Sequence, residues 1–149
     1  MIEYAMLEQE QRVLVGSRDP NIRIEACKLG YGLDKLIKDD SAYVRRTVAE
    51  MKYGLDILVN DPSPIVREEV AKQGYGLNIL CNDVDEWVRA AVASQGYSLN
   101  TLLYDRSWRV RYKVAEQNYG LERLAYDSDF MVKKLARERI IAQRTSKND

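Results

Sequence analysis

Acidic and basic side chains recur in this chain at a fixed interval, and their spacing is the first sign of possible chemistry. Aspartates stand 22 residues apart, and a cation follows each of them six residues later. The pairs are Asp39 and Arg45, Asp61 and Arg67, Asp83 and Arg89, Asp105 and Arg111, and Asp127 and Lys133. A carboxylate beside a guanidinium could act as an acid–base pair. An active site is seldom repeated along a chain, however, so we expect structural ion pairs here and no catalytic residue.

The residue types most often used in catalysis and metal binding are nearly missing. The chain has no histidine and two cysteines, Cys27 and Cys81. It therefore lacks the commonest general base and the commonest metal ligand. Carboxylates such as Asp85 or Asp129 could serve an enzyme, but no motif surrounds them. We expect no enzyme activity, no cofactor and no metal site, and we expect both cysteines to be small buried side chains.

The same composition bears on where the protein works. Two cysteines do not form a disulfide framework, which favours a reducing environment. No apolar run approaches the roughly 20 residues that span a bilayer, and the first residues lack the pattern of a signal peptide. We therefore expect a cytoplasmic protein without a membrane partner.

The regular spacing reflects five repeats of 22 residues, which begin at Tyr31, Tyr53, Tyr75, Tyr97 and Tyr119. Counted from this tyrosine, leucine occupies positions 3 and 6, aspartate position 9, valine position 14 and the cation position 15. Such a period is typical of stacked supersecondary units. We predict one repeat domain over residues 1–149. Its parts are a degenerate N-terminal cap (1–30), repeats 31–52, 53–74, 75–96, 97–118 and 119–140, and a C-terminal tail (141–149) that frays from about Thr145.

Each repeat predicts two helices. The leucines at positions 3 and 6 indicate a short first helix or a 3₁₀ turn. Serine or aspartate fills position 11 in every repeat, which favours the N-cap of a second helix. Positions 14, 18 and 21 would form the buried face of that helix. A residue such as Gly74 or Asn118 at position 22 would end it in the left-handed conformation. The tyrosine at position 1 is expected to pack, with its hydroxyl reaching the turn.

The segment DPSPIVREEVA, from Asp61 to Ala71, resembles the second half of a HEAT-type repeat. The 22-residue spacing is similar to that of the leucine-rich-repeat variant. The resemblance covers residues 31–140 and extends loosely over 9–30. It implies an all-α fold, a right-handed α-solenoid (superhelix) of stacked short helix pairs, in which the aspartate and arginine columns join neighbouring turns. HEAT-type units are nearly twice as long, so the first helix must be truncated here. The leucine-rich-repeat variant is also known with an iron–sulfur cluster, which needs a set of cysteines, so no cofactor is carried over.

Functional residues are expected where the repeats differ from one another. Positions 12, 13 and 16 lie away from the valine face and become aromatic and basic in repeats 75–140. Tryptophan, tyrosine and arginine are enriched among residues that dominate binding energy. We therefore predict a partner-binding surface made of Trp87, Trp108, Arg109, Tyr112, Phe130 and Lys134. The alternative is that these aromatics pack against the C-terminal segment or a neighbouring copy of the chain.

These features favour a non-enzymatic scaffold that binds another protein. The alternative is a nucleic-acid-binding HEAT-like protein, since the resemblance includes solenoids of the DNA-glycosylase type. Basic residues interleaved with aromatics support it, namely Arg106, Arg109, Arg111 and Lys113. Against it, Lys plus Arg and Asp plus Glu both total 23, whereas a phosphate-binding groove is normally plainly basic.

Overall fold

Helices account for all the regular structure in residues 2–145, the part of the chain that the computed structural model describes. No strand occurs in this range, which confirms the expected all-α fold. Residues 146–149 of the predicted tail lie outside the described residues, whereas Thr145 is the last residue of a helix. The chain divides into two units, Met1–Tyr75 and Gly76–Asp149. Each unit is described by itself below.

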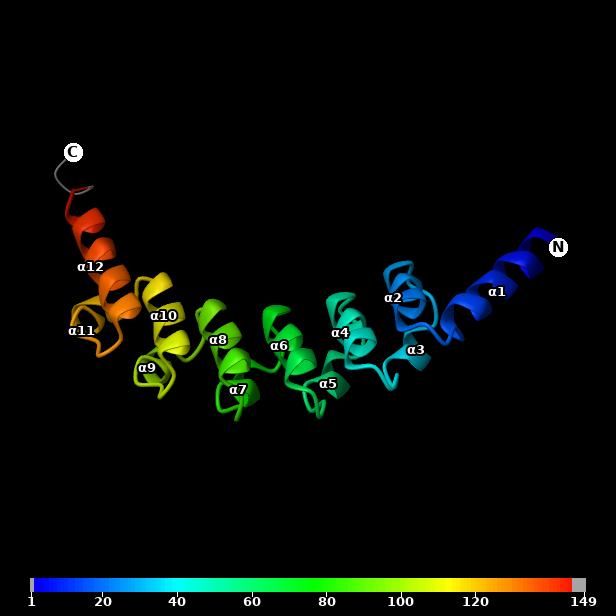
Figure 1. Ribbon diagram of the computed structural model, residues 1–149, viewed down its shortest axis with the longest axis horizontal. Coiled ribbons are helices and arrows are strands. Elements are labelled where there is room, and N and C mark those ends of the chain that lie inside the picture. The colour runs from blue at the N-terminus through cyan, green and yellow to red at the C-terminus, as the bar shows by residue number, and fades with distance from the viewer. Residues whose placement is uncertain (1, 146–149) are drawn as a thin grey trace. The chain divides into compact units, whose positions relative to one another are not determined.

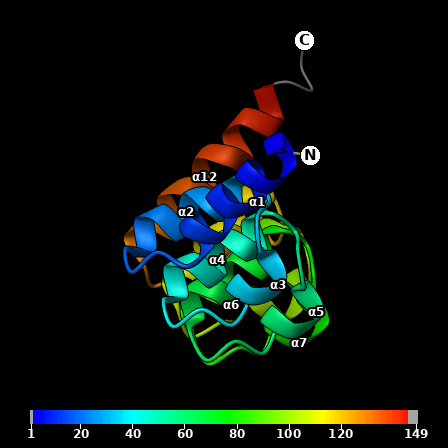
Figure 2. The same ribbon diagram turned by 90° about the vertical axis from the view of Figure 1, so that its right-hand side faces the viewer.

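The first unit alternates long and short helices after an initial longer one. It contains α1 (Ile2–Val15), α2 (Pro20–Lys28), α3 (Leu33–Leu36), α4 (Ala42–Glu50), α5 (Leu55–Leu58) and α6 (Pro64–Lys72). Helices α2, α4 and α6 lie side by side in chain order (Figure 1). The four-residue helices α3 and α5 lie on one side of α4 and α6 (Figure 2). The unit thus has a layer of longer helices and a layer of short ones.

The second unit repeats this alternation. It contains α7 (Leu77–Leu80), α8 (Glu86–Ser94), α9 (Leu99–Leu102), α10 (Trp108–Glu116), α11 (Leu121–Leu124) and α12 (Phe130–Thr145). Helix α10 packs between α8 and α12 (Figure 1). The predicted short first helix is confirmed in these repeats. It is one turn of α-helix that runs from the leucine at position 3 to the leucine at position 6. No helix in residues 2–145 is both long and apolar enough to cross a membrane.

The second helices begin where the polar residue at position 11 predicts. The Asp85 carboxylate accepts hydrogen bonds from the backbone N–H groups of Trp87 and Val88. Ser107 and Asp129 cap α10 and α12 in the same way. These bonds satisfy N–H groups that have no partner inside the helix, and they hold the start of α8, α10 and α12 in a defined place. Ser41 and Ser63 stand at the same position before α4 and α6, but their side chains make no such bond.

Two turns use the left-handed region of the backbone in every repeat but the last, whose position 22 is Ile140 inside α12. Position 22 has positive φ, as at Gly74 (75°) and Asn118 (57°), which confirms the predicted helix ends. Position 2 also has positive φ, as at Gly120 (61°), and this was not predicted. A Cβ atom on Gly120 would lie 2.6 Å from a methyl carbon of Leu103. Glycine is therefore needed there for space as well as for backbone angle.

The core lies between the two helix layers. Leucine at position 6 and valine at position 14 are almost fully buried in every repeat. The predicted third core position was wrong: position 19 is buried, as at Ala49 and Ala71, whereas Met51 at position 21 is 41% exposed. The position-1 tyrosines are also only half buried, and no described tyrosine hydroxyl makes a hydrogen bond with the turn.

The aspartate and arginine columns join consecutive repeats, as predicted. Arg89 donates to both carboxylate oxygens of Asp105 at 2.7 and 2.9 Å, across an interval of 16 residues. The same guanidinium donates to the Asp83 and Val84 carbonyls of its own repeat. Asp105 also accepts the Ser107 N–H at 2.8 Å. Within the units, equivalent pairs join Arg23 to Asp39, Arg45 to Asp61 and Arg111 to Asp127. These side chains are engaged in holding the fold.

Candidate functional site

Four of the six predicted site residues come together in the second unit. Trp87 is the second residue of α8, while Trp108 and Arg109 open α10 and Tyr112 follows one turn later. Because α8 and α10 pack side by side, residues one repeat apart become neighbours. We call Trp87, Trp108, Arg109 and Tyr112 the aromatic cluster.

Arg109 is the centre of this cluster. Its guanidinium carbon lies 4.8 Å from the centroid of the Trp87 ring and 4.9 Å from that of the Trp108 ring. Cations within about 6 Å of an aromatic centroid are attracted by the ring quadrupole. Arg109 Nη1 also donates to Glu86 Oε1 at 2.9 Å. Two indoles and one carboxylate thus hold the guanidinium in a single place.

Tyr112 extends the cluster along α10. The Trp108 and Tyr112 rings meet edge to face, with centroids 6.5 Å apart and planes at 85°. This is a favoured geometry for aromatic pairs, and the two residues share a helix face. The indole of Trp108 therefore contacts Arg109 and Tyr112 at once.

The cluster remains open to solvent despite these contacts. Trp87 is 53% exposed and Trp108 is 38% exposed. Tyr112 and Arg109 are partly buried. Beside them lies a groove lined by Val84, Asp85, Glu86, Arg89, Arg106 and Ser107. Large rings held in place next to a groove offer contact area that needs little further ordering when a partner binds.

Phe130 and Lys134, the other two predicted residues, stand apart from the cluster. Both lie on α12 and are exposed, Phe130 to 70%. Neither makes a ring contact with the cluster among the described residues. Lys134 instead lies 3.9 Å from Glu138 of its own helix. Phe130 and Lys134 lie four residues apart on α12, but no ring contact joins them in the described structure.

Two residues that complete the cluster were not predicted. Glu86 accepts from Arg109 and also from the Ser107 hydroxyl. Glu86 occupies position 12, where the following repeats carry Trp108 and Phe130. The sequence does place a carboxylate, Glu86, at position 12 of the repeat before the one that carries Arg109 at position 13. This spacing indicates an ion pair only when it is known that successive second helices pack against each other.

The basic residues that favoured nucleic acid are mostly engaged with carboxylates. Arg111 pairs with Asp127, Arg109 with Glu86, and Lys113 with Glu116. The Arg111 hydrogen bond, which outweighs the opposing effect of burial, holds the pKa of Asp127 below its usual value. Asp127 therefore remains charged and continues to neutralise its partner at neutral pH.

The two cysteines differ in their surroundings, and Cys27 does not lie in a reactive setting. Burial raises the pKa of the Cys27 thiol to about 11, so it is protonated at neutral pH. Its sulfur lies 4.0 Å from the Val44 carbonyl oxygen. Cys81 is partly buried, so the expectation that both would be buried is only half right. No group of three or more metal-ligating side chains occurs among the residues that the structure describes.

Comparison with models of known protein families finds no match for this chain, and comparison with curated proteins finds no significant relative.

Proposed function

We propose that the protein is a non-enzymatic scaffold that binds another protein through the aromatic cluster. The observation that carries this proposal is the Arg109 guanidinium fixed between the exposed Trp87 and Trp108 rings. Binding sites concentrate their energy in a few Trp, Tyr and Arg side chains, and an exposed apolar patch usually marks such a site.

We also propose that each unit is built from HEAT-like repeats with the right-handed stacking of an α-solenoid. Support comes from the bidentate bonds between an arginine and the aspartate of the next repeat. The position-15 arginine of one repeat reaches the position-9 aspartate of the following one, so every added repeat uses the same contact. This arrangement keeps the second helices, and the residues they display, in a fixed row.

Nucleic acid is the weaker candidate partner. Phosphate binding depends on cations that can neutralise phosphates, and three of the four basic residues near the cluster already face carboxylates. A protein partner, by contrast, can use the exposed indoles without displacing those pairs.

The proposal is tested by recovering the partner from the native cell with the tagged protein, with and without nuclease. The partner's affinity is then measured for wild type and for the double variant Trp108→Ala, Tyr112→Ala. We expect binding to weaken by about 2–4 kcal/mol, as in other truncations at interface centres. The melting temperature should stay nearly unchanged because Trp108 is partly exposed.

Two further variants make the result interpretable. Tyr126→Ala removes an aromatic ring that is exposed on the same unit but outside the cluster, and it should bind normally. Trp87→Ala removes the most exposed ring of the cluster and should weaken binding even if the double variant loses stability. Full binding by both cluster variants would exclude this site, and loss of the partner on nuclease treatment would favour nucleic acid.

A further inference from the structure

A second surface, separate from the aromatic cluster, lies on α12. Contacts between consecutive second helices show which positions face the following repeat. Arg46, at position 16, pairs with Glu69 of the next repeat. Glu86, at position 12, pairs with Arg109 in the same direction. Cys27, at position 19, lies against Val44. Positions 12, 16 and 19 thus form the forward face of a second helix.

Within the second unit no described helix follows α12 to cover this forward face. It carries Phe130, Lys134 and, further along, Ile141, which is 61% exposed. Arg137 lies between them in sequence, and its Nε donates to the Ala125 carbonyl at 3.0 Å. Residues at intervals of four and seven lie along one side of a helix. The helix is also strongly basic, with five cations and the single acid Glu138. The forward face of α12 is therefore an apolar stripe set among positive charges.

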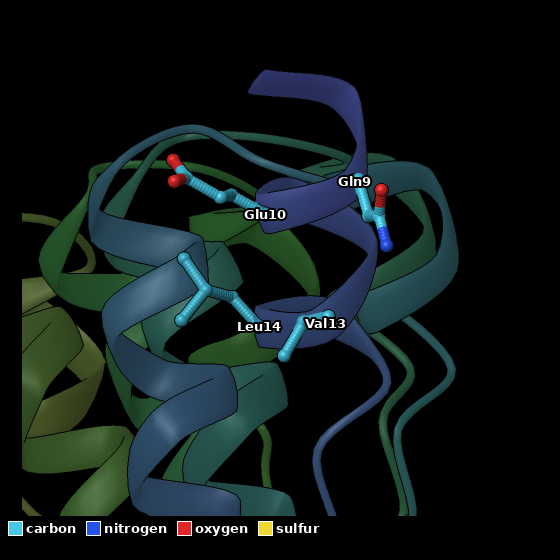
Figure 3. A pocket seen from close by; sticks show the side chains of 4 residues that line it. All are labelled: Gln9, Glu10, Val13 and Leu14. Atoms are coloured by element: carbon cyan, nitrogen blue, oxygen red, sulfur yellow. The ribbon is translucent and has the colours of Figure 1, made fainter. Parts of the chain in front are cut away.

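A surface of opposite character lies on α1 in the first unit. A mainly apolar hollow is lined by Gln9, Glu10, Val13 and Leu14. Figure 3 shows Glu10 and Leu14 projecting from α1 on the side of the neighbouring long helix. Val13 is largely exposed. Glu10 makes no ion pair with any described residue, whereas the nearby Glu8 lies 4.0 Å from Arg12. The hollow thus offers apolar contacts beside an unpaired carboxylate.

We propose that the forward face of α12 docks into the α1 hollow of a second copy of this chain. Phe130 and Ile141 would contact Val13 and Leu14, and Lys134 would pair with Glu10. Charge complementarity selects this partner, because one surface is basic around apolar side chains and the other is acidic beside them. The two surfaces differ, so the contact is heterologous and copies add head to tail.

The association should be weak and reversible. A stable interface buries about 1,600 Å² in total, and one helix face against one hollow offers less. Sedimentation velocity over a range of protein concentrations should show the average mass rising with concentration. It should fall again when the salt concentration is raised from about 0.05 M to 0.5 M, because the exposed ion pairs are screened.

Charge reversals at the two surfaces test the contact directly. Glu10→Lys and Lys134→Glu should each raise the apparent dissociation constant at least about tenfold. Matched controls are Glu8→Lys on α1 and Arg139→Glu on α12, which make the same change outside the two surfaces and should associate normally. Circular dichroism and a melting curve confirm that all four variants are folded.

Mixing the two disabled variants distinguishes this contact from other kinds of assembly. The Glu10→Lys chain keeps its α12 surface, and the Lys134→Glu chain keeps its α1 hollow. An equimolar mixture should therefore associate again, because the two intact surfaces pair as in the wild-type protein and the two reversed surfaces again carry opposite charges. A wild-type protein that stays monomeric at every concentration would overturn the proposal, as would variants that associate like wild type or a mixture that does not associate.

Discussion

Breaking the Arg89–Asp105 pair should destabilise the second unit by an amount that can be worked out from its contacts. Both side chains are nearly buried, 7% and 8% exposed. In Asp105→Ala, Arg89 loses two hydrogen bonds to a charged acceptor and the Ser107 N–H loses one. Removing one partner of a buried pair costs about 3–5 kcal/mol, because the other charge stays buried.

We expect the lower end of this range, about 3 kcal/mol. Arg89 keeps its hydrogen bonds to the Asp83 and Val84 carbonyls, at 2.7 and 3.1 Å, so its charge is not left without acceptors. The assay is urea unfolding followed by circular dichroism at neutral pH. The variant should unfold at a clearly lower urea concentration than the wild-type protein.

A double-mutant cycle with Arg89→Met isolates the pair itself. The double variant Arg89→Met, Asp105→Ala should lose less than the sum of the single losses, with a coupling of about 1–3 kcal/mol. Glu116→Ala is the matched control, because its pair with Lys113 is partly exposed and contributes about 0.5 kcal/mol. A loss of unfolding free energy for Asp105→Ala no larger than that of the control would refute the structural role assigned to the aspartate and arginine columns.

Three further predictions follow from single residues. Lowering the pH should leave the unfolding free energy nearly constant down to about pH 4 and reduce it below that. The reason is that Asp127 has a lowered folded-state pKa, so its contribution to stability is lost as it protonates. Acid unfolding followed by circular dichroism measures this, and Asp127→Asn should flatten the dependence. Iodoacetamide should modify Cys81 in the folded protein, as read by mass spectrometry, whereas Cys27, buried with its pKa raised to about 11, should react only after denaturation. Ser98→Gly should raise the unfolding free energy by about 0.5 kcal/mol, since Ser98 has φ of 55° where other repeats use glycine; an unchanged or lower urea midpoint would contradict this.

Much of the local structure could be predicted because the same residue types recur at the same positions in each repeat. The N-cap at position 11 and the helix end at position 22 depend on the chemistry of one residue and its immediate neighbours. The left-handed turn at position 2 could also have been found, since glycine fills it in four of five repeats. The alanine at position 19 was missed because helix periodicity alone does not show which side of the helix the next repeat covers.

The candidate site could be predicted only in part. The pair Trp108 and Tyr112 follows from their spacing within one helix. The position of Arg109 between Trp87 and Trp108 depends instead on how α10 packs on α8, across about one repeat of sequence. Phe130 shows the opposite case: its column suggested membership of the cluster, but no described contact brings its ring to the others.

The most direct test of the proposed binding site uses the protein's own fluorescence. The chain has two tryptophans, Trp87 and Trp108, and both belong to the aromatic cluster. Acrylamide quenching of their emission is measured with the recovered partner absent and then at saturation. Burial of both indoles by the partner should shift the emission to shorter wavelength and reduce quenching severalfold. Saturated binding with unchanged emission and unchanged quenching would contradict the proposal that the cluster is the binding site.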